Sequence, residues 1–159
     1  MSLESVERLM LVGLFRAHVD DQTFAPYEPP DLDATDLVEI QIHVYGQSFE
    51  YRNKRLDESF ALAMQGDIEA VGQYMAYARG AVMMLLAMKS LQGNIDEVRA
   101  WKIRRRVRRE TALMAGHFLG RLSDEEKNAI WIRLSHLRDL VENYLGRLEK
   151  IGVINVSMH

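Results

Sequence analysis

Apolar residues recur every three or four positions through most of this chain. Near the amino terminus, Val6, Met10, Gly13 and Ala17 form one short stripe. A second stripe contains Ile68, Val71, Met75, Ala78, Val82 and Leu85. The last third keeps a 4-3 alternation for three heptads, through Ile130, Leu134, Leu137, Val141, Tyr144, Leu148 and Ile151. This spacing places the apolar side chains on one face of a helix, so each segment predicts an amphipathic helix.

Glycines and capping residues divide the second half of the chain. Three glycines lie 27 residues apart, at Gly66, Gly93 and Gly120. Each is followed closely by a residue that favours a helix N-cap, at Asp67, Asn94 and Ser123. Ser123 also begins an S-x-x-E capping box with Glu126. The pattern predicts three helices over residues 67–151, antiparallel to one another because the connections are short.

Two interior glycines indicate a close approach between helices. Glycine inside a helix costs about 1 kcal/mol relative to alanine, which favours a packing reason for keeping it. Folding the sequence back at the turn near residues 93–94 places Gly72 opposite Gly116. We therefore expect these two backbones to pack closely; the alternative is that the two glycines are unrelated.

Residues 37–52 are ambiguous between strand and helix. Val38, Ile40, Ile42 and Val44 alternate with polar residues, as in a half-buried strand. A helical stripe also runs through the segment and continues toward Gly66, which favours helix. The predicted fold is an all-α, antiparallel, up-and-down bundle of about five helices. The alternative is an α+β fold with a small β-hairpin near residues 37–52 on a helical bundle.

The length of 159 residues suits a single domain over residues 1–159. Three prolines, Pro26, Pro29 and Pro30, predict an acidic loop over residues 20–34, because proline ends a helix. Residues 153–159 are predicted to be a C-terminal tail.

Charge is unevenly distributed along the chain. Residues 1–50 hold ten acidic and two basic residues, a net charge of −8, whereas residues 51–159 hold 18 basic and 13 acidic residues, a net charge of +5. Seven of the twenty basic residues fall between Arg99 and Arg109. On a helix, Ala100, Ile103 and Val107 form a narrow apolar stripe there, while Trp101 lies among the bases.

This basic segment has three interpretations. In the first, its arginines are a solvated face or pair with acids of the same fold, namely Asp20, Asp21, Glu28, Asp31, Asp33 and Asp36. In the second, they bind nucleic-acid phosphates. In the third, they dock an acidic protein surface, including that of a second copy. Like charges at i,i+4 repel one another, and arginine suits bidentate phosphate contacts. We favour nucleic acid, DNA or RNA, bound through Arg99, Trp101, Lys102, Arg104, Arg105, Arg106, Arg108 and Arg109.

Residues Ala81 to Met88 are apolar around the whole helix circumference and contain Met83, Met84 and Met88. Burial in the chain's own core is the simpler explanation. Methionine also tolerates varied partners, so the alternative function is a protein–protein adaptor or chaperone-like bundle that uses this surface. The run and the long apolar seam predict a homo-oligomer.

No pattern indicates catalysis. The chain lacks G-x-S-x-G, P-loop, G-x-G-x-x-G and H-E-x-x-H motifs, and its five histidines lie near acids without paired E-x-x-H motifs. It has no cysteine, no apolar run long enough to cross a bilayer and no basic segment at its amino terminus. We expect a non-enzymatic, cytoplasmic accessory protein without metal, cofactor or membrane contact, acting within a larger assembly.

Overall fold

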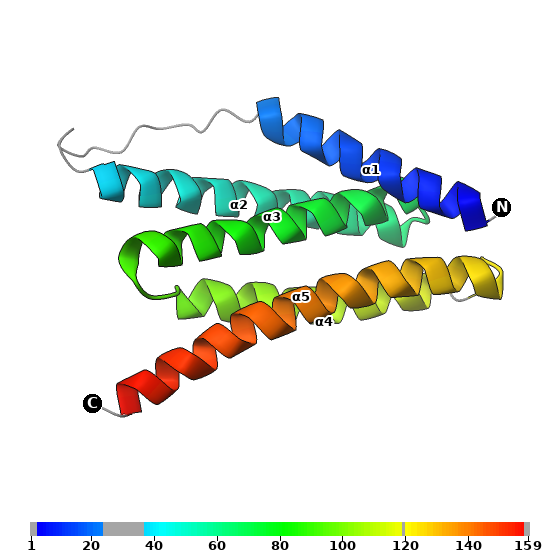
Figure 1. The fold of residues 1–159 in the computed structure, drawn as a ribbon. Helices are drawn as coiled ribbons and strands as arrows, with labels where there is room; N and C mark the ends of the chain where they lie inside the picture. The colour runs from blue at the N-terminus through cyan, green and yellow to red at the C-terminus, as the bar shows by residue number, and fades with distance from the viewer. Residues whose placement is uncertain (1–2, 24–36, 119, 158–159) are drawn as a thin grey trace.

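The computed structural model describes residues 3–23, 37–118 and 120–157, and these form five α-helices (Figure 1). The helices are α1 (Leu3–Thr23), α2 (Leu37–Met64), α3 (Ile68–Gln92), α4 (Glu97–His117) and α5 (Asp124–Ser157). The described residues contain no strand. The all-α helical bundle is therefore confirmed. The β-hairpin alternative is wrong, because the apolar stripe of residues 37–52 continues as one helix to Met64.

Successive helices run antiparallel to one another (Figure 1). α3 lies at the centre and packs against all four other helices. α1 and α2 flank α3 in one layer, and α4 and α5 form a second layer. Across the two layers, α1 packs on α5 and α2 packs on α4. In this arrangement α4 packs against α2, α3 and α5, and its outward face is exposed.

Local sequence determines the ends of α3. The Asp67 carboxylate accepts hydrogen bonds from the backbone N–H groups of Glu69 at 3.0 Å and Ala70 at 3.4 Å. These are N-terminal donors that have no partner within the helix. At the other end, Gly93 adopts a left-handed conformation with φ of 80° and donates to Lys89 O at 2.8 Å. Glycine takes this conformation without a steric penalty.

Of the N-caps predicted for the last two helices, that of α5 is confirmed and that of α4 is wrong. Ser123 and Glu126 form the predicted capping box, with reciprocal hydrogen bonds of 3.0 and 3.3 Å. The N-cap of α4 is Asp96, which accepts from Arg99 N at 3.1 Å, and the prediction of Asn94 is wrong. Both residue types are good caps, so the connection after Gly93 determines which is used.

Two predicted boundaries differ from the structure. α1 continues through Thr23, so Asp20 and Asp21 belong to the helix, and residues 24–34 of the predicted loop lie outside the described residues. α5 continues through Ser157, so residues 153–157 of the predicted tail are helical.

The apolar seam of α5 changes register near its end: Leu145 is buried and Tyr144 is exposed. A straight helix drifts relative to a strict heptad, which shifts the buried position by one residue.

A close backbone approach joins α1 to α3. A Cβ atom at Gly72 would overlap the carbonyl oxygen of Met10, and one at Gly13 would overlap that of Glu69. By contrast, a Cβ atom at Gly116 would meet nothing within 4 Å. The predicted pairing of Gly72 with Gly116 is therefore wrong. Gly72 instead packs on α1, because Gly13 supplies the matching gap in that helix.

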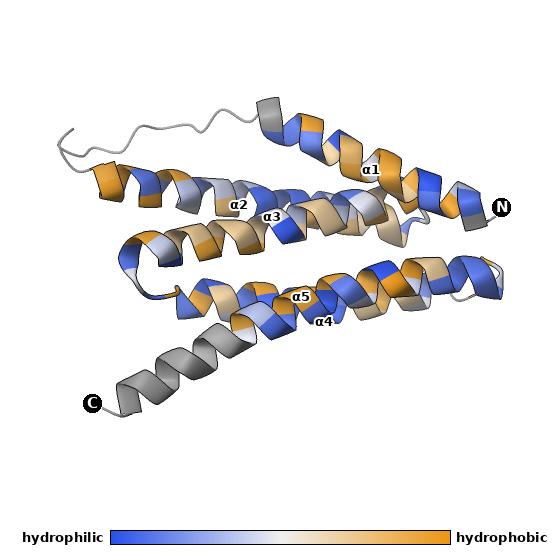
Figure 2. Cartoon of the chain, viewed as in Figure 1, coloured by the Kyte–Doolittle hydropathy of each residue, from blue (hydrophilic) through white to orange (hydrophobic). Residues whose placement is uncertain are grey.

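The buried core contains one face of each outer helix and more than half of the circumference of the central helix α3. Figure 2 shows hydrophobic residues recurring along every helix with polar residues between them. The predicted stripe of α4 is buried, at Ala100, Ile103, Val107, Met114 and Phe118. Of the three methionines considered as a partner surface, Met88 is buried in this core, Met84 is half-buried against it, and Met83 is 49% exposed.

Candidate nucleic-acid interface

The basic residues of α4 divide among three directions. Arg99 and Arg106 lie on the α2 side of the helix. The Arg99 guanidinium pairs with Glu50 at 3.2 Å and with Asp96 at 3.6 Å. Arg106 pairs with Asp57 and donates to the carbonyl oxygen of Asn53 at 3.2 Å. These contacts join α4 to α2, so both arginines have a structural role.

Arg106 also supports a buried polar contact. Its Nε donates to Oε1 of Glu110 at 2.6 Å, and the Tyr74 hydroxyl donates to the same oxygen at 3.0 Å. Glu110 is 4% exposed, although it lies on the apolar stripe of α4. Burial, and then the Glu110 charge, raise the pKa of Tyr74 well above its ordinary value. Tyr74 therefore stays protonated and serves as a donor.

Arg104 and Arg108 lie on the α5 side of α4. The Nε atoms of Arg104 and Arg108 lie 3.1 and 3.5 Å from the carboxylate of Glu142. Glu142 was not among the site residues predicted from the sequence. A signal was present, because reflecting the sequence through the turn near Ser123 places residue 142 opposite residue 104.

An open groove of about 520 Å³ lies between α4 and α5. Its lining contains five of the residues predicted to bind nucleic acid, together with Glu142: the set is Trp101, Arg104, Arg105, Arg108, Arg109 and Glu142. Glu142 is the one carboxylate among the described residues that line the groove, and Arg104 and Arg108 share it. These lining residues therefore carry an excess of positive charge.

The outward cations of α4 have no acidic partner in the part of the chain that the structure describes. Lys102, Arg105 and Arg109 make no ion pair with any described residue. The Arg105 guanidinium lies over the ring of Trp101, 5.1 Å from its centroid, and Trp101 is 52% exposed. This cation–π contact orients the arginine without neutralising its charge. We call Trp101, Lys102, Arg104, Arg105, Arg108 and Arg109 the basic face.

The acids of the amino-terminal half do not neutralise this face where the structure describes them. Asp20 pairs with Arg55 at 3.1 Å, and Asp21 pairs with Arg52 at 3.0 Å; both arginines belong to α2. The pairing of the basic segment with these two acids is therefore wrong. The other four acids considered, from Glu28 to Asp36, lie outside the described residues.

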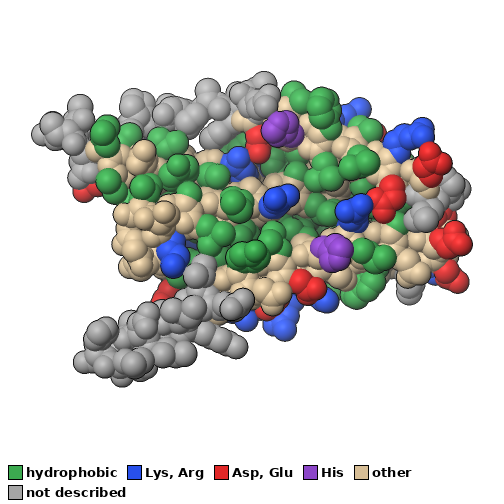
Figure 3. Space-filling view, viewed as in Figure 1, with side chains coloured by type: hydrophobic (Ala, Val, Ile, Leu, Met, Phe, Trp, Pro, Cys, Tyr) green, Lys and Arg blue, Asp and Glu red, His purple; other side chains and the backbone are tan. Residues whose placement is uncertain are grey.

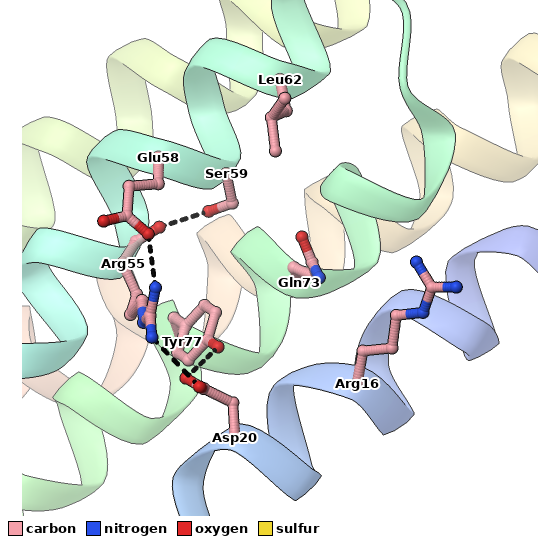
Figure 4. Close-up of a pocket in the computed structure, with 8 residues that line it drawn as sticks. All are labelled: Arg16, Asp20, Arg55, Glu58, Ser59, Leu62, Gln73 and Tyr77. Atoms are coloured by element: carbon pink, nitrogen blue, oxygen red, sulfur yellow. Dashed lines mark hydrogen bonds and ion pairs between the residues drawn. The ribbon is translucent and has the colours of Figure 1, made fainter. Parts of the chain in front are cut away.

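A second pocket of about 250 Å³ lies among α1, α2 and α3 (Figure 4). Figure 4 shows Arg55 and Tyr77 directed at the Asp20 carboxylate, with Arg55 also bonded to Glu58. Burial tends to raise the pKa of Asp20, but hydrogen bonds from Tyr51 and Tyr77 and the charge of Arg55 outweigh it and lower the pKa. Asp20, Arg55 and Glu58 satisfy one another, and Arg16 pairs with Glu69 of α3 at 2.6 Å, which indicates a structural junction.

The described residues contain neither a metal-binding cluster nor a membrane-spanning helix, and the chain has no match among known families. In the part of the chain that the structure describes, no three His, Cys, Asp or Glu side chains are grouped so that they could hold a metal ion. No helix among these residues is long and apolar enough to span a membrane. No protein-family model matches the chain, and neither the curated proteins nor the solved structures contain a match.

Proposed function

We propose that this protein is a non-enzymatic accessory protein that binds the phosphate backbone of nucleic acid through the basic face of α4. The observation that carries the proposal is the position of Lys102, Arg105 and Arg109. These three cations share one exposed face, have no acidic partner among the described residues, and adjoin a half-exposed tryptophan in a groove.

Folding stability does not account for this arrangement. Arg105 and Arg109 are four residues apart on a helix, where like charges destabilise by a few tenths of a kcal/mol. Neither forms an ion pair with a described carboxylate that would offset the repulsion. Phosphate groups supply that compensation, because arginine contacts them bidentately and releases the counterions condensed on the nucleic acid.

The proposal assigns no nucleic-acid contact to Arg99 and Arg106. Both were among the residues predicted from the sequence to bind nucleic acid, but their guanidinium groups are engaged with α2. Arg106 is 17% exposed. Arg104 and Arg108 contribute more weakly than the outward cations, because Glu142 offsets part of their charge.

A charge-matched pair of variants tests the proposal. The first changes Lys102, Arg105 and Arg109 together to Gln. The control changes Lys89, Arg79 and Arg121 to Gln, one lysine and two arginines outside the groove that pair with no described carboxylate. Fluorescence anisotropy with labelled oligonucleotides at low salt measures affinity, and thermal melting measures stability.

We expect the first variant to bind about tenfold more weakly or worse and the control to bind like the parent, since only the first loses phosphate contacts. Both variants should melt near the parent temperature, because the changed side chains make no tertiary ion pair. Equal weakening in the two variants, or a parent protein that binds no oligonucleotide, would contradict the proposal.

A second candidate function is a protein–protein adaptor. Figure 3 shows hydrophobic side chains gathered over α1, α3 and α5 on the viewed face. α1 exposes Leu11, Phe15 and Val19 at a spacing of four, and α3 exposes Met83. Met88 is excluded from such a contact because it is buried. Self-association stays a prediction: sedimentation at micromolar concentration should give a mass above 18.3 kDa, and a monomer at all concentrations would contradict it.

A further inference from the structure

A second tryptophan–arginine pair lies on α5. Trp131 is 46% exposed, and the Arg138 guanidinium lies over its ring, 5.5 Å from the centroid. Trp131, Arg138 and Glu142 are separated by seven and four residues, so they fall within about 40° of arc on a helix. Glu142 faces Arg104 and Arg108 of α4. Trp131 therefore lies on the face of α5 that bears Glu142, outside the residues that line the groove beside Trp101.

The helix register gives the separation of the two tryptophans. Arg104 contacts Glu142, and a Cβ atom at Gly146 would lie 3.6 Å from the Arg104 guanidinium. Residue 104 is thus opposite residues 142–146, and the antiparallel register places Trp131 level with residue 117 of α4. That point is about 16 residues, or about 24 Å, from Trp101 along the helix axis.

We infer that the α4–α5 surface is a track for single-stranded nucleic acid, with a base-stacking tryptophan at each end. The inference rests on the proposed function and names its ligand class. At roughly 3.4 Å per nucleotide of a stacked strand, 24 Å spans about seven nucleotides, and fewer of an extended strand. Between the tryptophans lie the phosphate-binding cations of α4, Arg104, Arg105, Arg108 and Arg109. Arg138 of α5 lies there too, with its charge partly offset by Asp139 at 3.8 Å.

The packing of α4 favours a single strand over a duplex. A major groove about 12 Å wide admits a helix that protrudes from its domain. α4 does not protrude, because α2 and α5 flank it and α3 lies beneath it. Bases that are paired and stacked in a duplex also offer no face to Trp101 or Trp131, whereas unpaired bases stack on aromatic side chains.

Single-tryptophan variants give a direct test, because the chain contains only two tryptophans. In Trp101→Ala, all tryptophan fluorescence comes from Trp131; in Trp131→Ala, it comes from Trp101. Each variant is titrated with oligothymidylates of about 4 to about 12 nucleotides and with a duplex. We expect both tryptophans to be quenched by the single strands and little affected by the duplex.

Affinity gives an independent readout. Each tryptophan-to-alanine change should weaken single-strand binding roughly 5- to 100-fold, because one stacked base is lost. The matched control is Tyr144→Ala, which removes an aromatic side chain of α5 that is 55% exposed and lies off the Glu142 face. It should bind like the parent. Parent affinity should also rise with oligonucleotide length up to about seven nucleotides.

The outcomes separate the two proposals. If the Lys102, Arg105 and Arg109 variant loses binding while Trp131 is not quenched and Trp131→Ala binds like the parent, the track is overturned and the proposed function stands. Equal or tighter binding to the duplex also overturns the track alone. If the parent binds neither single strands nor duplex, both are overturned.

Discussion

Tyr74 of α3 and Glu110 of α4 form a buried hydrogen bond of 3.0 Å between the two layers of the bundle. Arg106 donates to the same carboxylate oxygen and continues to Asp57 of α2. One of the seven basic residues between Arg99 and Arg109 thus neutralises a buried acid. The basic segment therefore combines structural arginines with cations that are available to a ligand.

Changing Arg106 to Gln should destabilise the fold by about 3–5 kcal/mol, because it leaves the buried Glu110 carboxylate without its charged partner. Urea denaturation measures the change in the free energy of unfolding. Arg105→Gln should stay within about 0.5 kcal/mol of the parent. Adding Glu110→Gln to Arg106→Gln should recover part of the loss, since the unpaired charge is gone. An Arg106→Gln protein as stable as the parent would contradict this role.

Alanine substitutions should distinguish the packed glycines from the open one. Gly13→Ala and Gly72→Ala should each lower the melting temperature, because the added methyl group overlaps a backbone carbonyl of the facing helix. Gly116→Ala should be neutral or stabilising by up to about 1 kcal/mol, since its surroundings are open and alanine favours helix. Thermal denaturation of the three variants checks this order. A destabilised Gly116→Ala with an unaffected Gly72→Ala would restore the packing expected from the sequence alone.

Asp20 should make stability depend on pH. Its pKa is lowered in the folded protein, so the ionised carboxylate stabilises the fold. That contribution is fully present above the unfolded value of about 3.8 and is lost as the pH falls through the lower folded value. At neutral pH, Asp20→Asn should cost about 1–3 kcal/mol, because hydrogen bonds to a charged group are lost.

The measurement is urea denaturation of the parent and Asp20→Asn proteins between neutral pH and about pH 3. The difference between the two should be constant near neutral pH and should shrink below about pH 4. A difference that is independent of pH would show that the Asp20 charge does not hold α1 to α2 and α3.

Glu142→Gln should strengthen nucleic-acid binding. The change removes the one carboxylate among the described residues that line the groove and releases the charge of Arg108 that it offsets. We expect a several-fold gain in affinity at low salt and a salt dependence steeper by about one phosphate contact. Glu50→Gln is the matched control, because it removes an acid that pairs on the opposite side of α4. An unchanged or weaker affinity for Glu142→Gln would contradict the assignment of the groove.

Periodicity and capping patterns predict the number and order of the helices, because both are local. The buried face of α4 follows from the spacing of Ala100, Ile103 and Val107. The helix against which a small residue packs cannot be predicted from this spacing. Gly72 packs on Gly13 of α1 and not on α4, the next helix in the sequence. A near tie between two good caps, Asn94 and Asp96, is likewise resolved only by the connection between the helices.

The sequence predicts where the basic residues of the site lie, but it does not predict which of them pair within the fold and which stay exposed. Composition identifies the segment from Arg99 to Arg109 as basic. The separation of Arg99 and Arg106 from Lys102, Arg105 and Arg109 depends on the sides of α4 that face α2 and α5, which is a tertiary relationship. Trp131 was missed because it has no basic cluster around it in the sequence, and its place beside the groove arises from the α4–α5 register.

The salt dependence of binding tests the central claim most directly. Affinity for a single-stranded oligonucleotide is measured over a series of salt concentrations, for the parent and for the variant with Lys102, Arg105 and Arg109 changed to Gln. The proposed contacts predict that the log–log slope of the variant is smaller by about 2, since each phosphate contact contributes about 0.7 on a single strand. Parallel slopes for the two proteins, or a parent affinity that does not change with salt, would contradict the claim that this face binds phosphates.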